Sequence, residues 1–277
     1  EALPLYEKAL IPIRAAGDRK LEARVLDQIG FMYDRRGDLR EALVWYRQAL
    51  PVRREVGDRE GEALTLIGMG LTHQSLGESD EALDYYTQSL AVAEAGGWPW
   101  RRIEALNNIG AVHWYRDEYD KALDYYNRAR SLAIADKDRS RESSMLHNIG
   151  NIYRALGDYE RAREHLEMAL EIRTNLHEIW KQAVTLHELG NTYLDEKRAS
   201  EARAHYEQAL PLRRQAGDRR GEAYTLDALG LTARVLKENE KALDYARQAE
   251  AIWESVSDKR GRAETHESLG LIYAAMG

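Results

Sequence analysis

Two histidines are the residues whose type and spacing come closest to a metal-binding pattern in this sequence. His147 and His187 are separated by 40 residues, and Glu188 directly follows the second histidine. Imidazole and carboxylate groups bind zinc, but a zinc site needs at least three protein ligands. If the histidines occupy equivalent places in packed helices, they lie on the order of 10 Å apart. We therefore expect both to line a polar groove and not to bind a metal.

Other catalytic patterns are absent from the sequence. The chain has no cysteine, which excludes thiolate nucleophiles, disulfides and cysteine-ligated zinc. It has no phosphate-binding glycine-rich loop after a strand, no His-Glu-x-x-His motif and no serine in a nucleophile-elbow context. We expect no catalytic residues, no metal and no cofactor, so the chain is predicted not to be an enzyme.

Composition limits the kinds of partner. Charged residues make up 31% of the chain and apolar residues 44%, which suits a folded protein with a core. The formal net charge of −7 argues against nucleic acid, because phosphate binding depends on clustered Lys and Arg. No run of about 18 apolar residues could span a bilayer, so we expect no membrane partner. The lack of cysteine fits a cytoplasmic location, and the initial Glu suggests a segment of a longer protein.

A 40-residue period organises the whole sequence. Glycine recurs at 30, 70, 110, 150, 190, 230 and 270, and alanine stands twelve residues after each of the first six. A leucine precedes six of the seven glycines by four residues. Glycine costs a helix up to about 1 kcal/mol, so its recurrence indicates close packing between helices.

Each period is predicted to contain two helices, which we call helix A and helix B. Leu26, Ile29 and Tyr33 share one face of helix A, and Ala42 and Tyr46 share one face of helix B. Gly-Asp pairs such as Gly37-Asp38 would end one helix and cap the next. We expect fourteen helices in one array over residues 1–277. The ranges are helix B at 1–16, A/B repeats at 19–56, 59–96, 99–136, 139–176, 179–216 and 219–256, and a last helix A at 259–276.

Three blocks of this sequence resemble tetratricopeptide (TPR) repeats. They are Leu146–Tyr153 (LHNIGNIY), Gly157–Ala162 (GDYERA) and Gly217–Glu222 (GDRRGE). The period is similar to the long repeats of kinesin light chains, Pins-type adaptors and bacterial signalling proteins. The resemblance implies an all-α, right-handed superhelix, an α-solenoid in which helix A lines a concave groove. It also implies that a peptide or protein segment binds along that groove.

The registers that face the groove in this family hold a group of asparagines in the middle repeats. These are Asn108, Asn148, Asn151 and Asn191. An amide side chain can pair with both groups of an extended peptide backbone. The alternative is that these amides bridge neighbouring helices or face water.

Larger side chains flank the asparagines. Trp114, Tyr115 and Arg154 are expected near them as interface anchors, although Trp114 could equally be buried between repeats. Phe31, Leu64, Ile67 and Leu71 are expected to form an apolar patch of the groove nearer the start of the chain. The segment Gly96–Trp100 (GGWPW) departs from the usual turn sequence, which local packing explains best, and a second partner site is the alternative.

Acidic residues outnumber basic ones in the groove registers. Arg24, Arg35, Arg154 and Arg234 stand against Asp27, Asp34, Glu104, Glu188, Asp195, Asp227, Glu264 and Glu267. A mildly acidic groove favours a neutral or basic ligand.

The function favoured by these features is a non-catalytic scaffold that binds a protein or peptide. One alternative is a regulatory or sensory domain of a bacterial signalling protein, which would bind a signal peptide or its own effector domain. Another is end-to-end self-assembly, through partly bare side chains on the first helix (Leu3, Tyr6, Leu10) and the last (Leu269, Ile272, Tyr273).

Overall fold

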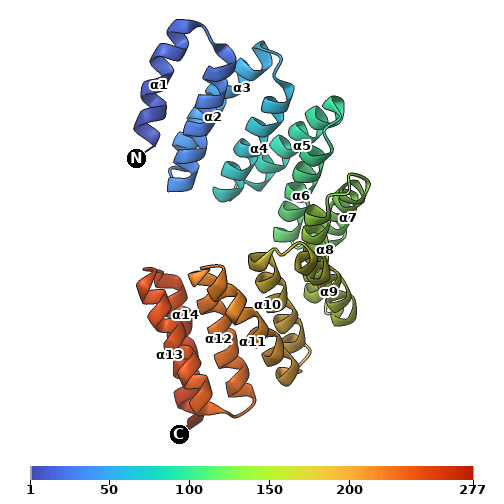
Figure 1. The fold of residues 1–277 in the computed structure, drawn as a ribbon, viewed down its shortest axis with the longest axis vertical. Helices are drawn as coiled ribbons and strands as arrows, with labels where there is room; N and C mark the ends of the chain where they lie inside the picture. The colour runs from blue at the N-terminus through green and yellow to red at the C-terminus, as the bar shows by residue number, and fades with distance from the viewer. Residues whose placement is uncertain (1, 277) are drawn as a thin grey trace. The chain divides into compact units, whose positions relative to one another are not determined.

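The computed structural model describes residues 2–276, so Glu1 and Gly277 lie outside the described residues. Those residues form fourteen α-helices and no strand, in two compact units, residues up to Asp138 and residues from Arg139 (Figure 1). Unit 1 holds α1 (Leu3–Ala16), α2 (Arg19–Arg36), α3 (Leu39–Glu55), α4 (Arg59–Ser75), α5 (Ser79–Gly96), α6 (Pro99–Tyr115) and α7 (Tyr119–Ala135). Unit 2 holds α8 (Arg139–Ala155), α9 (Tyr159–Asn175), α10 (Ile179–Asp195), α11 (Ala199–Gln215), α12 (Arg219–Val235), α13 (Asn239–Ser255) and α14 (Lys259–Met276).

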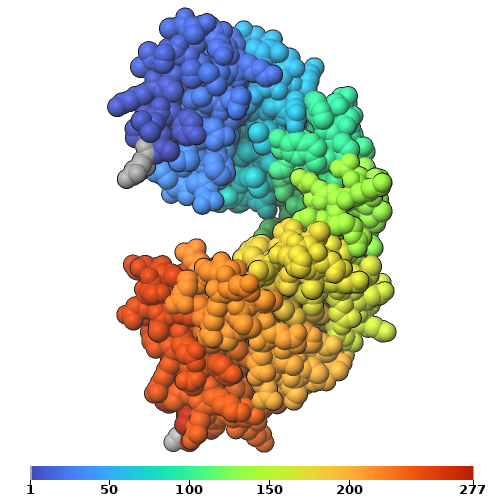
Figure 2. Space-filling view, viewed as in Figure 1, coloured from blue at the N-terminus to red at the C-terminus, as the bar shows by residue number. Residues whose placement is uncertain are grey.

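Within each unit the even-numbered helices are helix A of a pair and the odd-numbered helices are helix B. Successive helices are joined by very short turns and therefore run antiparallel, as Figure 1 shows for each unit. Side chains fill the space between neighbouring helices of a unit (Figure 2). The expected fold class, an all-α solenoid of fourteen helices, is confirmed. That the whole chain behaves as one cooperative array stays a prediction.

The turns repeat with half the sequence period. A residue with positive φ stands every 20 residues from Gly17 to Ser257 among the described residues. The backbone N–H of Gly217 donates to the carbonyl of Arg214 at 3.1 Å, and the backbone N–H of Asp218 donates to the carbonyl of Arg213 at 3.0 Å. Asp218 then caps α12 by accepting the N–H of Gly221 at 2.9 Å. One left-handed residue and one cap thus reverse the chain.

Six of these left-handed turn residues are not glycine, which the sequence did not lead us to expect. They are Asp117, Lys137, His177, Lys197, Lys237 and Ser257, with φ between 55° and 65°. Left-handed backbone costs a non-glycine residue roughly 1 kcal/mol or more. The packing of the flanking helices must therefore hold these turns in place.

The glycine of helix A leaves room for a side chain of helix B to pack against its backbone. A Cβ atom built on Gly30, Gly70, Gly110 or Gly190 would lie 2.9 Å or less from a tyrosine ring of the paired helix. On Gly150 it would lie 2.8 Å from Leu166 and 3.1 Å from the carbonyl of Ala162. The glycines thus allow close packing, as expected, and mostly under an aromatic ring.

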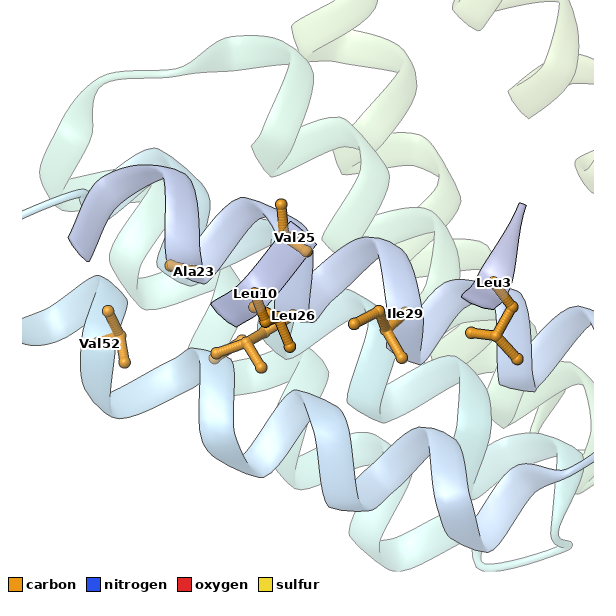
Figure 3. Packing of buried hydrophobic residues seen from close by; sticks show 8 residues of the cluster. Leu3, Leu10, Ala23, Val25, Leu26, Ile29 and Val52 are labelled. Atoms are coloured by element: carbon orange, nitrogen blue, oxygen red, sulfur yellow. The ribbon is translucent and has the colours of Figure 1, made fainter. Parts of the chain in front are cut away.

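The end helices are more buried than the sequence suggested. Leu3 and Leu10 were expected to be partly bare, but they are 7% and 4% exposed, because they pack on Leu26 and Ile29 of α2 (Figure 3). Ile272 was also expected to be bare and is fully buried against α12 and α13.

The exposed apolar side chains of these helices include Leu5 and Ile11 of α1 and Tyr273 of α14, at 67%, 74% and 51%. Tyr6 and Leu269 are half-buried. Self-assembly through the end helices stays a prediction.

Replacing Gly150 by Leu should destabilise the protein by about 1–3 kcal/mol, because the new side chain overlaps Leu166 and the α9 backbone. Gly270→Leu is the matched control, since nothing lies within 4 Å of a Cβ atom there. The control should be neutral, or stabilising through helix propensity. Urea unfolding followed by circular dichroism measures both variants, and equal losses would contradict the packing role.

Candidate functional site

A buried polar group recurs between neighbouring repeats, and its clearest form lies in unit 1. The guanidinium of Arg53 on α3 contacts Asp27 of α2 at 2.5 and 3.1 Å, and Thr65 of α4 donates to the same carboxylate at 2.7 Å. Arg53 also pairs with Asp58. Burial raises the pKa of Asp27, and the bonds from Arg53 and Thr65 oppose that rise. This carboxylate has its partners within the fold and ties three helices together.

The same three registers in unit 2 hold His147, Arg173 and Thr185. Arg173 is 4% exposed, and it donates to Nδ1 of His147 at 3.3 Å, to Thr185 and to the Lys181 carbonyl. Burial lowers the pKa of Arg173 to about 10. Burial and the neighbouring guanidinium lower the pKa of His147 to about 3. His147 is therefore neutral at physiological pH.

Asn151 is bound to that neutral histidine. Because a guanidinium can only donate, Nδ1 of His147 accepts and the ring proton is on Nε2. The side-chain amide of Asn151 lies 3.3 Å from Nε2. The structure places Nδ2 of Asn151 there, and exchanging the oxygen and nitrogen of the amide would let the oxygen accept the Nε2 proton. Asn151 thus supports the fold within unit 2.

Asn191 and Arg154 belong to a second network of unit 2. Asn191 donates to Glu188 at 3.1 Å and accepts the hydroxyl of Tyr206 at 2.7 Å. Arg154 contacts Asp195 at 2.8 Å and Glu188 at 3.5 Å. The structure brings these predicted groove residues together, but in contacts with one another.

The remaining sequence-predicted residues are divided between the units. His187 of α10 lies 3.2 Å from Thr225, and burial lowers its pKa. Asn148 is half-buried on α8 and also has an interaction partner. In unit 1, the Asn108 oxygen accepts a bond from Asn107 at 3.3 Å, Trp114 contacts the Tyr119 ring, and Tyr115 is 73% exposed. No group of three potential metal ligands occurs in residues 2–276.

The open apolar surface lies on α2, α4 and α6 of unit 1, and we call it the helix-A face. Phe31, Leu64 and Leu71 are 47%, 37% and 44% exposed. Ile67 was predicted in the same patch, and it is 2% exposed and forms a wall. These four residues, with Tyr46, line a cavity of about 250 Å³.

A missing side chain opens this cavity. Gly68 occupies the register that holds Gln28, Asn108, Asn148 and Glu188 in other repeats. A Cβ atom on Gly68 would lie 2.9 Å from the Tyr46 ring, so even alanine would crowd the site. The sequence displays this gap, since only Ala228 is also apolar among the other residues of the register, but the position of the Tyr46 ring is visible only in the structure.

A second cavity, of about 490 Å³, continues along the helix-A face. Leu71 lines both cavities, and Gln74, Val112 and Tyr115 line the second. A larger cavity of unit 1, about 680 Å³, is formed by helix ends and turns around Trp98. Two of its four charged residues have partners in the fold, with Asp58 bound to Arg53 and Arg59 bound to Glu62. The helix-A face is therefore the better candidate surface.

Comparison with known proteins identifies the family. A family model described as tetratricopeptide repeat matches residues 1–55, 45–95, 101–175 and 181–255. The chain belongs to the TPR family. TPR proteins are generally non-catalytic scaffolds, and the match indicates no enzyme family. No curated protein matches the sequence.

Solved structures share the TPR fold at low identity. BtubC (BKLC) from P. vanneervenii is 21% identical, with a TM-score of 0.69, over 78% of this chain and 91% of that one. A signal transduction ATPase with a TPR sensor, from Pyrococcus horikoshii, is 15% identical, with a TM-score of 0.73, over 98% and 44%. Aspartyl phosphate phosphatase F from Bacillus subtilis is 13% identical, with a TM-score of 0.69, over 95% and 74%. In the described part of the TPR chain, no helix is long and apolar enough to cross a bilayer.

The contacts of Asn191 predict a role in stability. Asn191→Ala removes the acceptor of the buried Tyr206 hydroxyl and should cost about 1–3 kcal/mol. The double variant Asn191→Ala/Tyr206→Phe should lose less than the sum of the single losses, because no hydroxyl is left unpaired. Urea titrations of the wild type, Asn191→Ala, Tyr206→Phe and the double variant measure the coupling energy. Strictly additive losses of stability would contradict this role.

His147 predicts a loss of stability in acid. The unfolded chain binds a proton near the ordinary histidine pKa of 6.5, whereas folded His147 binds one near 3. Stability from this residue is therefore complete above pH 6.5 and falls as the pH drops toward 3. His147→Gln should flatten that part of the curve relative to His165→Gln, a change of a half-buried histidine in the same unit. Melting temperatures between pH 7 and 4 test this, and parallel curves would refute it.

Proposed function

We propose that this TPR chain is a non-catalytic scaffold whose helix-A face in unit 1 holds an extended segment of another protein. The supporting observation is the row of exposed Phe31, Leu64, Leu71 and Tyr115 above two cavities that share Leu71. Exposed apolar residues gathered over cavities are typical of binding surfaces. Alternate side chains of an extended peptide point to the same side, so two adjacent cavities suit two of them.

The ligand is expected to be neutral or basic. Three carboxylates, those of Asp27, Asp34 and Glu104, line the smaller cavity, and its lining contains no Lys or Arg. An acidic segment would meet like charge there. A contact of the peptide with Asn108, Asn148, Asn151, Asn191, His147, His187, Trp114 or Arg154 stays a prediction.

A regulatory or sensory role is the second candidate. Its support is the Pyrococcus horikoshii neighbour, whose TPR array is described as a sensor and which matches 98% of this chain. Both roles use a bound segment, and they differ in what the binding controls. The domain content of the full-length protein separates them.

Leu71→Gln should weaken peptide binding at least tenfold, because it places an amide at the junction of the two cavities. Ile134→Gln on α7 is the matched control, since Ile134 is 50% exposed and Leu71 44%. The probe is a set of peptides selected on the wild-type chain from a displayed random library, measured by fluorescence polarisation. Equal affinities of the two variants for every selected peptide would refute the proposed surface.

A further inference from the structure

The smaller cavity of the helix-A face has a polar end that its apolar walls do not explain. Tyr46 lines it and is only 5% exposed, and its hydroxyl has no hydrogen-bond partner in residues 2–276. Two equivalent tyrosines do have one, since Tyr86 donates to Gln74 at 2.8 Å and Tyr206 donates to Asn191 at 2.7 Å. The Tyr46 oxygen is not among the buried atoms without a partner, so it opens to the cavity, and a ligand group that pairs with it would replace water there.

One carboxylate at the cavity also lacks a cation. Asp27 is bound by Arg53, and Glu104 by Arg101 at 2.8 Å. Asp34 accepts only the hydroxyl of Thr72, at 2.9 Å, and no Lys, Arg or His lies within ion-pair distance of it in residues 2–276. Burial raises the pKa of Tyr46, and the nearby carboxylates of Asp34 and Asp27 raise it further. The phenol is thus a protonated neighbour of a carboxylate without a counter-ion.

The size of the cavity selects the kind of occupant. Its volume of about 250 Å³ lies below the roughly 300–1,000 Å³ typical of pockets for drug-sized ligands, so it suits a single side chain. Phe31, Leu64, Ile67 and Leu71 form apolar walls that match a run of methylene groups. Lys and Arg side chains combine such a stem with a charged head.

We propose that this cavity binds a lysine or arginine side chain of the extended segment. The stem packs on Phe31, Leu64 and Leu71, and the charged head donates hydrogen bonds to the Asp34 carboxylate and the Tyr46 hydroxyl. An aliphatic side chain would cover both polar groups without pairing them, and a carboxylate would be repelled by Asp34. The inference rests on the proposed function, because it assigns the ligand chemistry of the same surface.

The test uses the full chain and five pools of fluorescein-labelled nonapeptides. The central residue is Lys, Arg, norleucine, Gln or Glu, and the other positions are randomised identically in every pool. Fluorescence polarisation should show the Lys and Arg pools binding about tenfold tighter than the norleucine pool, the effect expected of a charge-assisted hydrogen bond. The Glu pool should bind weakest.

Three variants distinguish the loss of the charged contact with the ligand from a loss of folding. Asp34→Asn keeps the acceptor for Thr72 and should abolish the preference for basic pools. Tyr46→Phe loses only an unpartnered hydroxyl, so it should fold, and it should weaken the basic pools severalfold without changing the norleucine pool. Asp120→Asn, on the exposed first turn of α7, should preserve the preference. Thermal melting of each variant reports whether it is folded.

The outcomes distinguish the two proposals. Binding of all pools without a basic preference, or a preference that survives Asp34→Asn and Tyr46→Phe, overturns the assignment of the cavity and leaves the scaffold function intact. If no pool binds and Leu71→Gln has no effect on any selected peptide, both proposals are overturned.

Discussion

The contact between a helix-A glycine and a side chain of helix B determines how most of the pairs pack. Where the partner is tyrosine, the ring lies on bare backbone, and the two helices approach as closely as the ring allows. Leu166 takes this place on Gly150, and the backbone of α13 lies nearest to Gly230. The polar networks and the cavity depend on this arrangement. Asn191 binds the hydroxyl of the ring that covers Gly190, and Tyr46, which covers Gly30, also lines the cavity beneath Gly68.

Repeats with the same backbone differ in the chemistry that links them to their neighbours. Asp27 is paired with Arg53 and His147 with Arg173, whereas Asp227 accepts the indole N–H of Trp253 at 3.0 Å. In one repeat these registers hold Ile67, Ala93 and Ala105, all buried and apolar. Ile67 is a wall of the proposed binding cavity. The repeat with apolar residues in these registers therefore supplies an apolar wall to this cavity.

The fold could be predicted because glycine, leucine and alanine recur every 40 residues and so indicate which faces of the helices pack together. Exposure of Phe31, Leu64, Leu71 and Tyr115 follows from the same register. The roles of the asparagines could not be predicted, because their partners differ from repeat to repeat, with His147 of the same helix for Asn151 and Tyr206 of the next helix for Asn191. The error at Leu3 and Leu10 has a different cause. The expectation treated the first helix as lacking a neighbour on its apolar side, but that side packs on α2.

The left-handed turn residue, which recurs every 20 residues, gives the backbone a shorter period than the side chains, which repeat every 40. A duplication or deletion of 40 residues preserves both periods and leaves every glycine opposite its partner. A duplication or deletion of 20 residues would preserve the turns but place helix-A sequences where helix-B sequences belong, so that Leu66, for example, would stand in the place of Tyr46 opposite Gly30. The array is therefore able to change length by whole pairs of helices, although its backbone geometry alone would permit the gain or loss of a single helix.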